Sequence, residues 1–180
     1  KTASSTRIVR LRDASGNGQN GVYFYLDPQV CGHDALKQLK KTLASALYET
    51  PRRRRAAIRS RCIGLGYSEG GMNYTHQDQH ELPYQALVML SDPGCDFTGG
   101  ELYVEVRERN GSPAPNYKPP LHCASNFAEG GGAGDVVLFC ANSIERSGKI
   151  LECFHGMTRV RAGTRDLCER WAVGLFHGSM

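Results

Sequence analysis

Two histidines and one aspartate of this 180-residue chain have the types and spacing of a metal site. His76 and Asp78 are two residues apart, so in a strand their side chains would lie on the same face. His155, far downstream, could join them from a second strand. Two imidazoles and one carboxylate on one side of a metal leave coordination positions open, an arrangement typical of non-haem Fe(II) sites that react with O2. The pattern therefore predicts an open metal site.

The elements that would position these residues are short apolar runs separated by Gly and Pro. Such punctuation after residue 61 is typical of an antiparallel sandwich or barrel. The expected strands cover residues 62–67, 84–90, 97–104, 134–139, 154–160 and 170–176.

The first 61 residues have a different pattern. Thr6–Arg12 and Gly21–Leu26 resemble two strands around a Gly/Asn turn, and Asp34–Tyr48 has apolar residues at helical spacing. We expect this helix to cover one face of the β core, with Trp171 packed beneath it.

The order of motifs in the second part of the chain resembles a known superfamily. The motifs are His-Gln-Asp at 76–78, Leu-Ser-Asp-Pro-Gly-Cys-Asp-Phe-Thr-Gly-Gly-Glu at 90–101, Gly-Asp at 134–135, His-Gly at 155–156 and Gly-Leu-Phe-His at 174–177. Residues from about 63 to 177 resemble the core of the Fe(II)/2-oxoglutarate-dependent dioxygenases. Within that superfamily, the run is especially similar to a family described as oxygenases that act on damaged DNA.

The resemblance implies a mainly β protein with flanking helices, built as a double-stranded β-helix, which is a distorted, cupin-like jelly roll. Residues 1–180 would form a single domain. Residues 1–61 would supply N-terminal strands and supporting helices, and residues 62–180 would form the β-helix core.

The resemblance also implies an activity. His76, Asp78 and His155 would bind Fe(II), with 2-oxoglutarate and O2 as cosubstrates and ascorbate as a candidate stimulant. Decarboxylation of 2-oxoglutarate to succinate would be coupled to hydroxylation, or oxidative demethylation, of a protein side chain, a modified nucleic acid or a small molecule. The alternative is a cupin-like metal-binding or sensing module without turnover, against which the intact set of site residues argues.

The distal carboxylate of 2-oxoglutarate would need a buried cation. Arg165 follows His155 at the spacing common in the superfamily. Arg170 instead opens the last expected strand, and period 2 places it on one face with Ala172 and Gly174, which leave room beside a metal. A strand that began at Arg165 would direct Glu169 inward, toward that carboxylate. We therefore expect Arg170 to bind it, with Arg165 as the alternative.

Three further residues are candidates for contacts in the site. Tyr67 lies nine residues before His76, where the related demethylases of alkylated nucleic acids have a tyrosine bonded to the same carboxylate. Asn73 and His80 are candidates for contacts with cosubstrate or substrate. Leu65 departs from those demethylases, which have a polar group at that position.

Composition limits the setting. The seven cysteines include no Cys-x-x-Cys pair, which favours reduced thiols in a soluble, intracellular protein of the cytoplasm or nucleus. No run of eighteen apolar residues occurs, so we expect no membrane span. The cluster Arg52–Arg55 could contact phosphate, or it could be a solvated helix start or a sorting signal. Residues 107–134, rich in Gly and Pro, could form a lid or a flexible connection.

Overall fold

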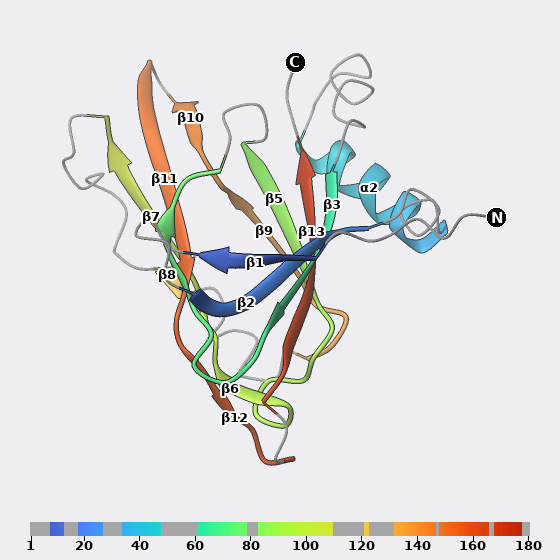
Figure 1. The fold of residues 1–180 in the computed structure, drawn as a ribbon. Helices are drawn as coiled ribbons and strands as arrows, with labels where there is room; N and C mark the ends of the chain where they lie inside the picture. The colour runs from blue at the N-terminus through green and yellow to red at the C-terminus, as the bar shows by residue number, and fades with distance from the viewer. Residues whose placement is uncertain are drawn as a thin grey trace.

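The computed structural model describes residues 8–12, 18–26, 34–47, 61–78, 83–109, 121–122, 132–146, 148–165 and 168–177. Within these ranges the chain is mainly β, and two sheets face each other with one helix on the outside (Figure 1). The expected double-stranded β-helix, a distorted jelly roll, is confirmed.

The larger sheet has six strands, and every neighbouring pair is antiparallel. In spatial order they are β1 (Ile8–Arg12), β2 (Gly18–Tyr25), β3 (Arg61–Tyr67), β13 (Arg170–His177), β5 (Tyr84–Met89) and β9 (Val136–Cys140). The two N-terminal strands therefore extend the sheet of the core.

The smaller sheet is built around one long strand. Its strands in order are β10 (Ser143–Arg146), β11 (Lys149–Met157), β7 (Leu102–Glu108) and β8 (Leu121–His122), and β4 (Asn73–His76) also pairs with β11. A two-stranded sheet of β6 (Phe97–Gly99) and β12 (Val160–Ala162) lies at the narrow lower end of the molecule in Figure 1.

Strand β3 combines large residues on its inner face with glycines on its outer face. A Cβ atom at Gly64 would collide with the Phe24 ring, and one at Gly66 would collide with the Trp171 ring. The two rings therefore lie across the outer face of β3, with centroids 6.4 Å apart. Trp171 thus points away from the cavity, as expected, and contacts β2 and β3; its packing beneath the helix stays a prediction.

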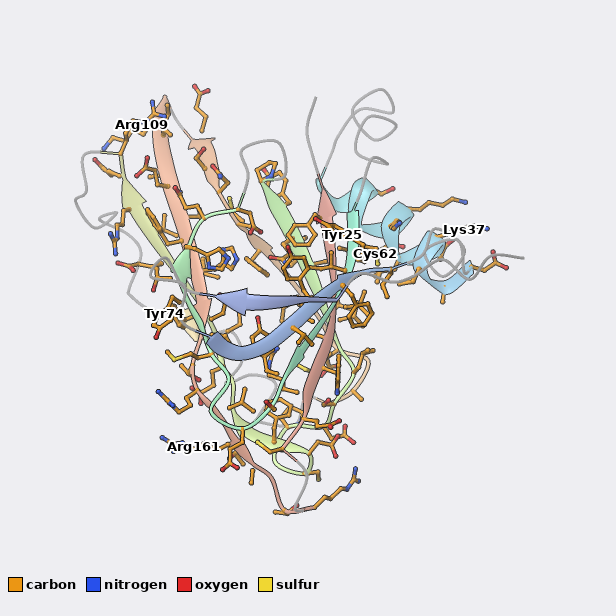
Figure 2. All side chains as sticks on the ribbon, viewed as in Figure 1. Tyr25, Lys37, Cys62, Tyr74, Arg109 and Arg161 are labelled. Atoms are coloured by element: carbon orange, nitrogen blue, oxygen red, sulfur yellow. The ribbon has the colours of Figure 1, made fainter. Side chains whose placement is uncertain are left out.

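The helix α2 (Asp34–Leu47) confirms the helical spacing of its apolar residues. Leu36 and Leu39 pack against a buried cluster of Cys62, Ala86 and Leu175 on the outer face of the larger sheet. In Figure 1 the helix lies beside β3 and β13, and in Figure 2 Lys37 points away from the sheet. The described helical residues lack the length and hydrophobicity that a bilayer crossing requires.

A second apolar cluster fills the space between the sheets. Its most deeply buried members are Met89, Phe97, Ala141, Val160 and Ala172. Cys95, Cys140, Cys153 and Cys168 are free thiols.

Several expected boundaries differ from the observed ones. The expected strand 97–104 is interrupted at Gly100, where Gly99 and Gly100 have φ angles of +64° and +62°. The expected strand 154–160 is the end of the longer β11, followed by a separate β12. Most of the possible lid, His80 and the Arg52–Arg55 cluster lie outside the described residues.

Candidate metal and cosubstrate site

His76, Asp78 and His155 converge between the two sheets. His76 and His155 are register partners in the β4–β11 pair, so both rings lie at one level of the smaller sheet. The Nε2 atom of His76 is 3.7 Å from Oδ1 of Asp78, and Nε2 of His155 is 3.8 Å from Oδ2. Among the residues that the structure describes, this is the group whose donor atoms all lie within 4.8 Å of one another.

Asp78 reaches this position from outside a strand. β4 ends at His76, so the expectation that both side chains alternate along one strand is wrong for Asp78. Its backbone N–H instead donates to the Ala141 carbonyl at 2.8 Å, and the Asn142 side-chain amide donates to its carbonyl. The connection between β9 and β10 therefore fixes the backbone that carries the carboxylate.

The tautomer of His76 follows from one hydrogen bond. Its Nδ1 atom is 2.7 Å from the Tyr74 carbonyl oxygen. A carbonyl oxygen only accepts, so Nδ1 carries the proton and donates it. In the neutral form of this ring, the lone pair lies on Nε2, which faces Asp78 and can bind a metal.

Burial sets the charges of the other two residues. Burial lowers the pKa of His155 to about 3, and the nearby His76 contributes in the same direction, so the ring is neutral near pH 7. Burial raises the pKa of Asp78 to about 6, while His76 opposes that rise. A cation close to such a buried carboxylate would favour its ionised form.

These three residues fit a divalent metal. Bonds from imidazole nitrogen and carboxylate oxygen are about 2.0 to 2.2 Å long, so separations of 3.7 and 3.8 Å can be spanned by one ion. Oδ2 of Asp78 is buried and has no hydrogen-bond partner among the described residues. Two imidazoles and one carboxylate would leave positions for other ligands.

Arg170 is the second unusual group between the sheets. Its side chain is fully enclosed, at 2% exposure, and its Nε atom has no hydrogen-bond partner in the described part of the chain. The guanidinium lies 5.8 Å from the ring centroids of Tyr67 and Phe97. Burial lowers its pKa to about 10, with Tyr67 opposing, so it stays charged near pH 7. A buried cation without an anion is a binding group for one.

Room for this arginine comes from a glycine. A Cβ atom on Gly100 would lie 2.8 Å from Cδ of Arg170, and Gly100 has a φ of +62°. Gly100 is thus a site residue that the sequence did not single out, because its role depends on a strand seventy residues away.

Tyr67 and Arg165 occupy contrasting positions. Tyr67 is the register partner of Arg170 across β3 and β13, and burial raises its pKa to about 12, with Arg170 opposing. Arg165 lies on an exposed turn, where its Nη1 atom is 3.0 Å from Oδ1 of Asp96 and 4.0 Å from Oδ2 of Asp92. Its side chain is 57% exposed, away from the interior.

One cavity of about 260 Å³ joins the triad to Arg170 and Tyr67. Asn73 also lines it, whereas His80 lies outside the described residues. The sequence did not predict several other lining side chains: Tyr23, Tyr25, Gln85, Leu87, Phe139 and Met157. Their alternation in strands was visible, but the face that each presents depends on strand pairing.

The model of a known protein family matches residues 38–177. The family, Oxygenase-NA, is described as "Oxygenase, catalysing oxidative methylation of damaged DNA". The match includes the three triad residues, Tyr67 and Arg170.

Curated proteins of Mycobacterium tuberculosis are similar to this chain in sequence. Uncharacterized protein Rv2227 of Mycobacterium tuberculosis (strain ATCC 25618 / H37Rv) is 34% identical over 124 residues, 66% of this chain and 48% of that protein. The chain thus spans about half the length of the curated relatives it matches.

Two solved structures share the fold. A Pseudomonas putida prolyl-4-hydroxylase has a TM-score of 0.53 and 15% identity, covering 89% of this chain and 72% of that one. An oxidoreductase of the 2OG-Fe(II) oxygenase family from Burkholderia pseudomallei has a TM-score of 0.50 and 15% identity, covering 96% and 72%.

Proposed function

Because the chain belongs to the Oxygenase-NA family of oxygenases, we propose that it depends on Fe(II) and 2-oxoglutarate. In this proposal, 2-oxoglutarate, O2 and a substrate C–H group are converted to succinate, CO2 and a hydroxylated product. Hydroxylation of an N-methyl group would release that methyl, so oxidative demethylation is a variant of the same reaction.

The observation that carries this proposal is the pairing of two unsatisfied groups in one cavity. Oδ2 of Asp78 and Nε of Arg170 are both buried, and neither has a hydrogen-bond partner among the described residues. The two are not ion-paired with each other among the described contacts, so each is free for an added ligand. A metal satisfies the first, and a dicarboxylic acid bound to that metal can reach the second.

The chain's own residues have separate tasks in this proposal. His76, Asp78 and His155 would hold iron, which when bound supplies the activation of O2. Arg170 would pair with the distal carboxylate, and Tyr67 would donate its hydroxyl proton to the same group. With its pKa raised to about 12, Tyr67 keeps that proton near pH 7. The enclosing side chains Leu65, Leu87 and Phe139 would limit access of water.

The direct test is turnover without an added substrate. Purified protein with Fe(II), O2 and 2-oxoglutarate labelled in the C1 carboxylate should release labelled CO2 and form succinate in equal amounts. Omission of iron should stop both. Iron binding without any CO2 release would contradict the proposal, and a metal-binding module would then be the better description.

For the primary substrate, we propose modified nucleic acid as the first class to test, since the family description names damaged DNA. Single-stranded and duplex oligonucleotides with methylated bases should lose methyl groups by mass spectrometry, in step with succinate formation. Binding to phosphate should weaken steeply as salt is raised, because counterions are released. Coupled turnover on peptides alone would contradict this choice of class.

A further inference from the structure

Gln85 is a buried amide that the proposed reaction does not use. Its residue exposure is 4%, and it lines the cavity that contains the triad and Arg170. No hydrogen bond joins its side-chain amide to another described residue, and Gln85 borders the cavity. Buried amides normally have partners, because burying an unpaired donor or acceptor costs free energy. An amide left open at a cavity wall is therefore a binding group for a ligand.

Residues of the neighbouring strands β3, β9 and β13 show where the Gln85 amide lies in the cavity. Its Nε2 atom lies 3.1 Å from the position of a Cβ on Gly174, and Ile63 Cγ1 is equally near that position. Gly174 thus leaves the space in which the amide lies across β13. On the metal side, the register partner of Gln85 on β9 is Phe139, whose ring is 5.1 Å from the His155 ring.

Two tyrosines line the cavity farther along the same sheet, on β2, with β3 and β13 between them and Gln85. Tyr23 and Tyr25 both line the cavity, and their rings meet edge to face with centroids 6.0 Å apart. Tyr25 is the register partner of Ile63, so it lies next to the space reached by the amide. It is 51% exposed, at the mouth of the cavity, and is labelled in Figure 2. Exposed aromatic faces at a mouth favour flat rings as ligands.

The wall around the amide carries no charge of its own. Every charged side chain that lines the described cavity belongs either to the triad or to Arg170. With metal and 2-oxoglutarate in place, a charged substrate group would be buried without a partner, which is unfavourable. The cavity of about 260 Å³ is also below the usual range for a drug-sized ligand, about 300 to 1,000 Å³. Only a small part of the substrate can enter beside the cosubstrate.

We infer that Gln85, with Tyr23 and Tyr25, forms a recognition subsite for an uncharged, flat ring that carries a hydrogen-bond donor and acceptor on one edge. The Gln85 amide would bond that edge in a paired fashion, and the tyrosines would contact the ring. The inference rests on the proposed function, in which the metal binds the triad and 2-oxoglutarate binds Arg170. It assigns Gln85 as a specificity-determining residue.

The test uses small probes and no turnover. The protein is loaded with Mn(II), with and without 2-oxoglutarate, in the absence of O2. Four probes are titrated: 2-pyridone (ring with the amide edge), propionamide (edge without a ring), toluene (ring without an edge) and benzylammonium (charged ring). Broadening of probe proton lines by Mn(II) reports binding near the metal, and calorimetry reports 2-oxoglutarate binding.

In the wild-type protein, 2-pyridone should bind more tightly than the other three. Gln85→Met, close in size but without the amide, should weaken 2-pyridone about tenfold, equivalent to 1.4 kcal/mol, and leave toluene unchanged. Gln85→Glu should shift the preference toward benzylammonium. Gln38→Met, on the exposed face of α2, is the matched control and should change nothing.

Three outcomes would overturn the inference. The first is equal affinity for all uncharged probes in wild-type protein, and the second is an equal loss of toluene and 2-pyridone in Gln85→Met, which would indicate packing alone. The third is a fall in 2-oxoglutarate affinity by the same factor, which would assign Gln85 to the cosubstrate. If 2-pyridone behaves as expected but 2-oxoglutarate never binds, the proposed function is overturned and the subsite stands.

Discussion

His76 and His155 lie directly opposite each other across the antiparallel pair β4–β11, with ring centroids 4.3 Å apart and ring planes inclined at 50°. β4 has only four residues, so its register on β11 is decisive for the site. A shift of one residue would turn His76 to the opposite face of the sheet. The candidate metal site is therefore a property of strand pairing as much as of residue type.

Removal of one proposed ligand should disable metal binding. We expect His76→Ala and Asp78→Ala each to lower Fe(II) affinity by at least about 100-fold, since even loss of an outer partner of a ligand costs about 10- to 100-fold. Anaerobic isothermal titration calorimetry would measure this. Asp34→Ala, which removes an exposed carboxylate on α2, is the control and should bind iron as the wild type does. Normal affinity in either ligand variant would remove that residue from the site.

The Asp78 carboxyl should make the metal-free protein less stable as pH rises. Its pKa in the folded state is raised from 3.8 to about 6, mainly by burial, so the folded state holds the proton more tightly than the unfolded state. The favourable contribution of this carboxyl to folding stability is fully present below about pH 4, and it is lost as pH rises through 6. At 1.36 kcal/mol per pH unit, the loss is on the order of 3 kcal/mol.

Asp78→Asn should accordingly be more stable than the metal-free wild type at pH 7, by roughly 1 to 3 kcal/mol, and should lose that advantage near pH 4. The opposite pH dependence of His155, whose pKa is lowered, is shared by both proteins and cancels in the comparison. Urea unfolding at both pH values is the measurement. Saturating Fe(II) should reverse the order at pH 7, because it stabilises only the protein that binds it. If the difference in stability between Asp78→Asn and the wild type did not change with pH, the raised pKa of Asp78 would be refuted.

Much of the scaffold could be predicted because its patterns are local. The apolar spacing of Asp34–Leu47 matches one face of a helix, and the alternation in β3 and β13 marks an inner face. The start of β13 at Arg170 was expected from the same alternation, which places Arg170, Ala172 and Gly174 on one face. Hence Arg170 could be placed from the pattern of its strand, whereas Tyr67 was expected from the family resemblance.

The remaining site residues depend on contacts between distant segments. Asp78 lies beyond the end of β4 and is held by the β9–β10 connection, which no pattern near residue 78 indicates. Gln85 and Tyr25 face the cavity only because β5 and β2 flank the central strands in the observed order. Hairpin strand β10 was also missed, since Ser143–Arg146 is short and not apolar.

The two arginines should separate clearly in cosubstrate binding. Arg170→Ala should raise the 2-oxoglutarate concentration needed for half-maximal succinate formation by more than about tenfold, the factor equivalent to 1.4 kcal/mol. Arg165→Ala should change it less than about twofold, because its partners are Asp96 and Asp92 on the surface. The reverse order would show that the exposed turn, and not β13, supplies the cation.

Arg170 should also be replaceable without loss of the fold. Arg170 is a buried cation whose Nε has no hydrogen-bond partner among the described residues. Without cosubstrate, Arg170→Met should therefore be at least as stable as the wild type. Thermal unfolding with and without 2-oxoglutarate would measure this. The cosubstrate should stabilise the wild type and leave Arg170→Met unchanged. A large loss of stability in Arg170→Met without cosubstrate would indicate a structural role for the guanidinium.

Gly100 provides a test of how the arginine is positioned. A Cβ at this position would meet Cδ of Arg170 at 2.8 Å and Nε at 3.2 Å, and the backbone φ is +62°. Gly100→Ala should therefore lower the free energy of unfolding by about 1 to 3 kcal/mol through backbone strain. It should also raise the 2-oxoglutarate requirement several-fold, because the side chain of Arg170 must move. Gly148→Ala separates the two effects, since Gly148 has a φ of +74° and no atom within 4 Å of the added Cβ. It should lose similar stability in urea unfolding and keep the wild-type requirement for 2-oxoglutarate. An equal rise in that requirement for both variants would mean that strain alone weakens binding and that Gly100 has no specific role in placing Arg170.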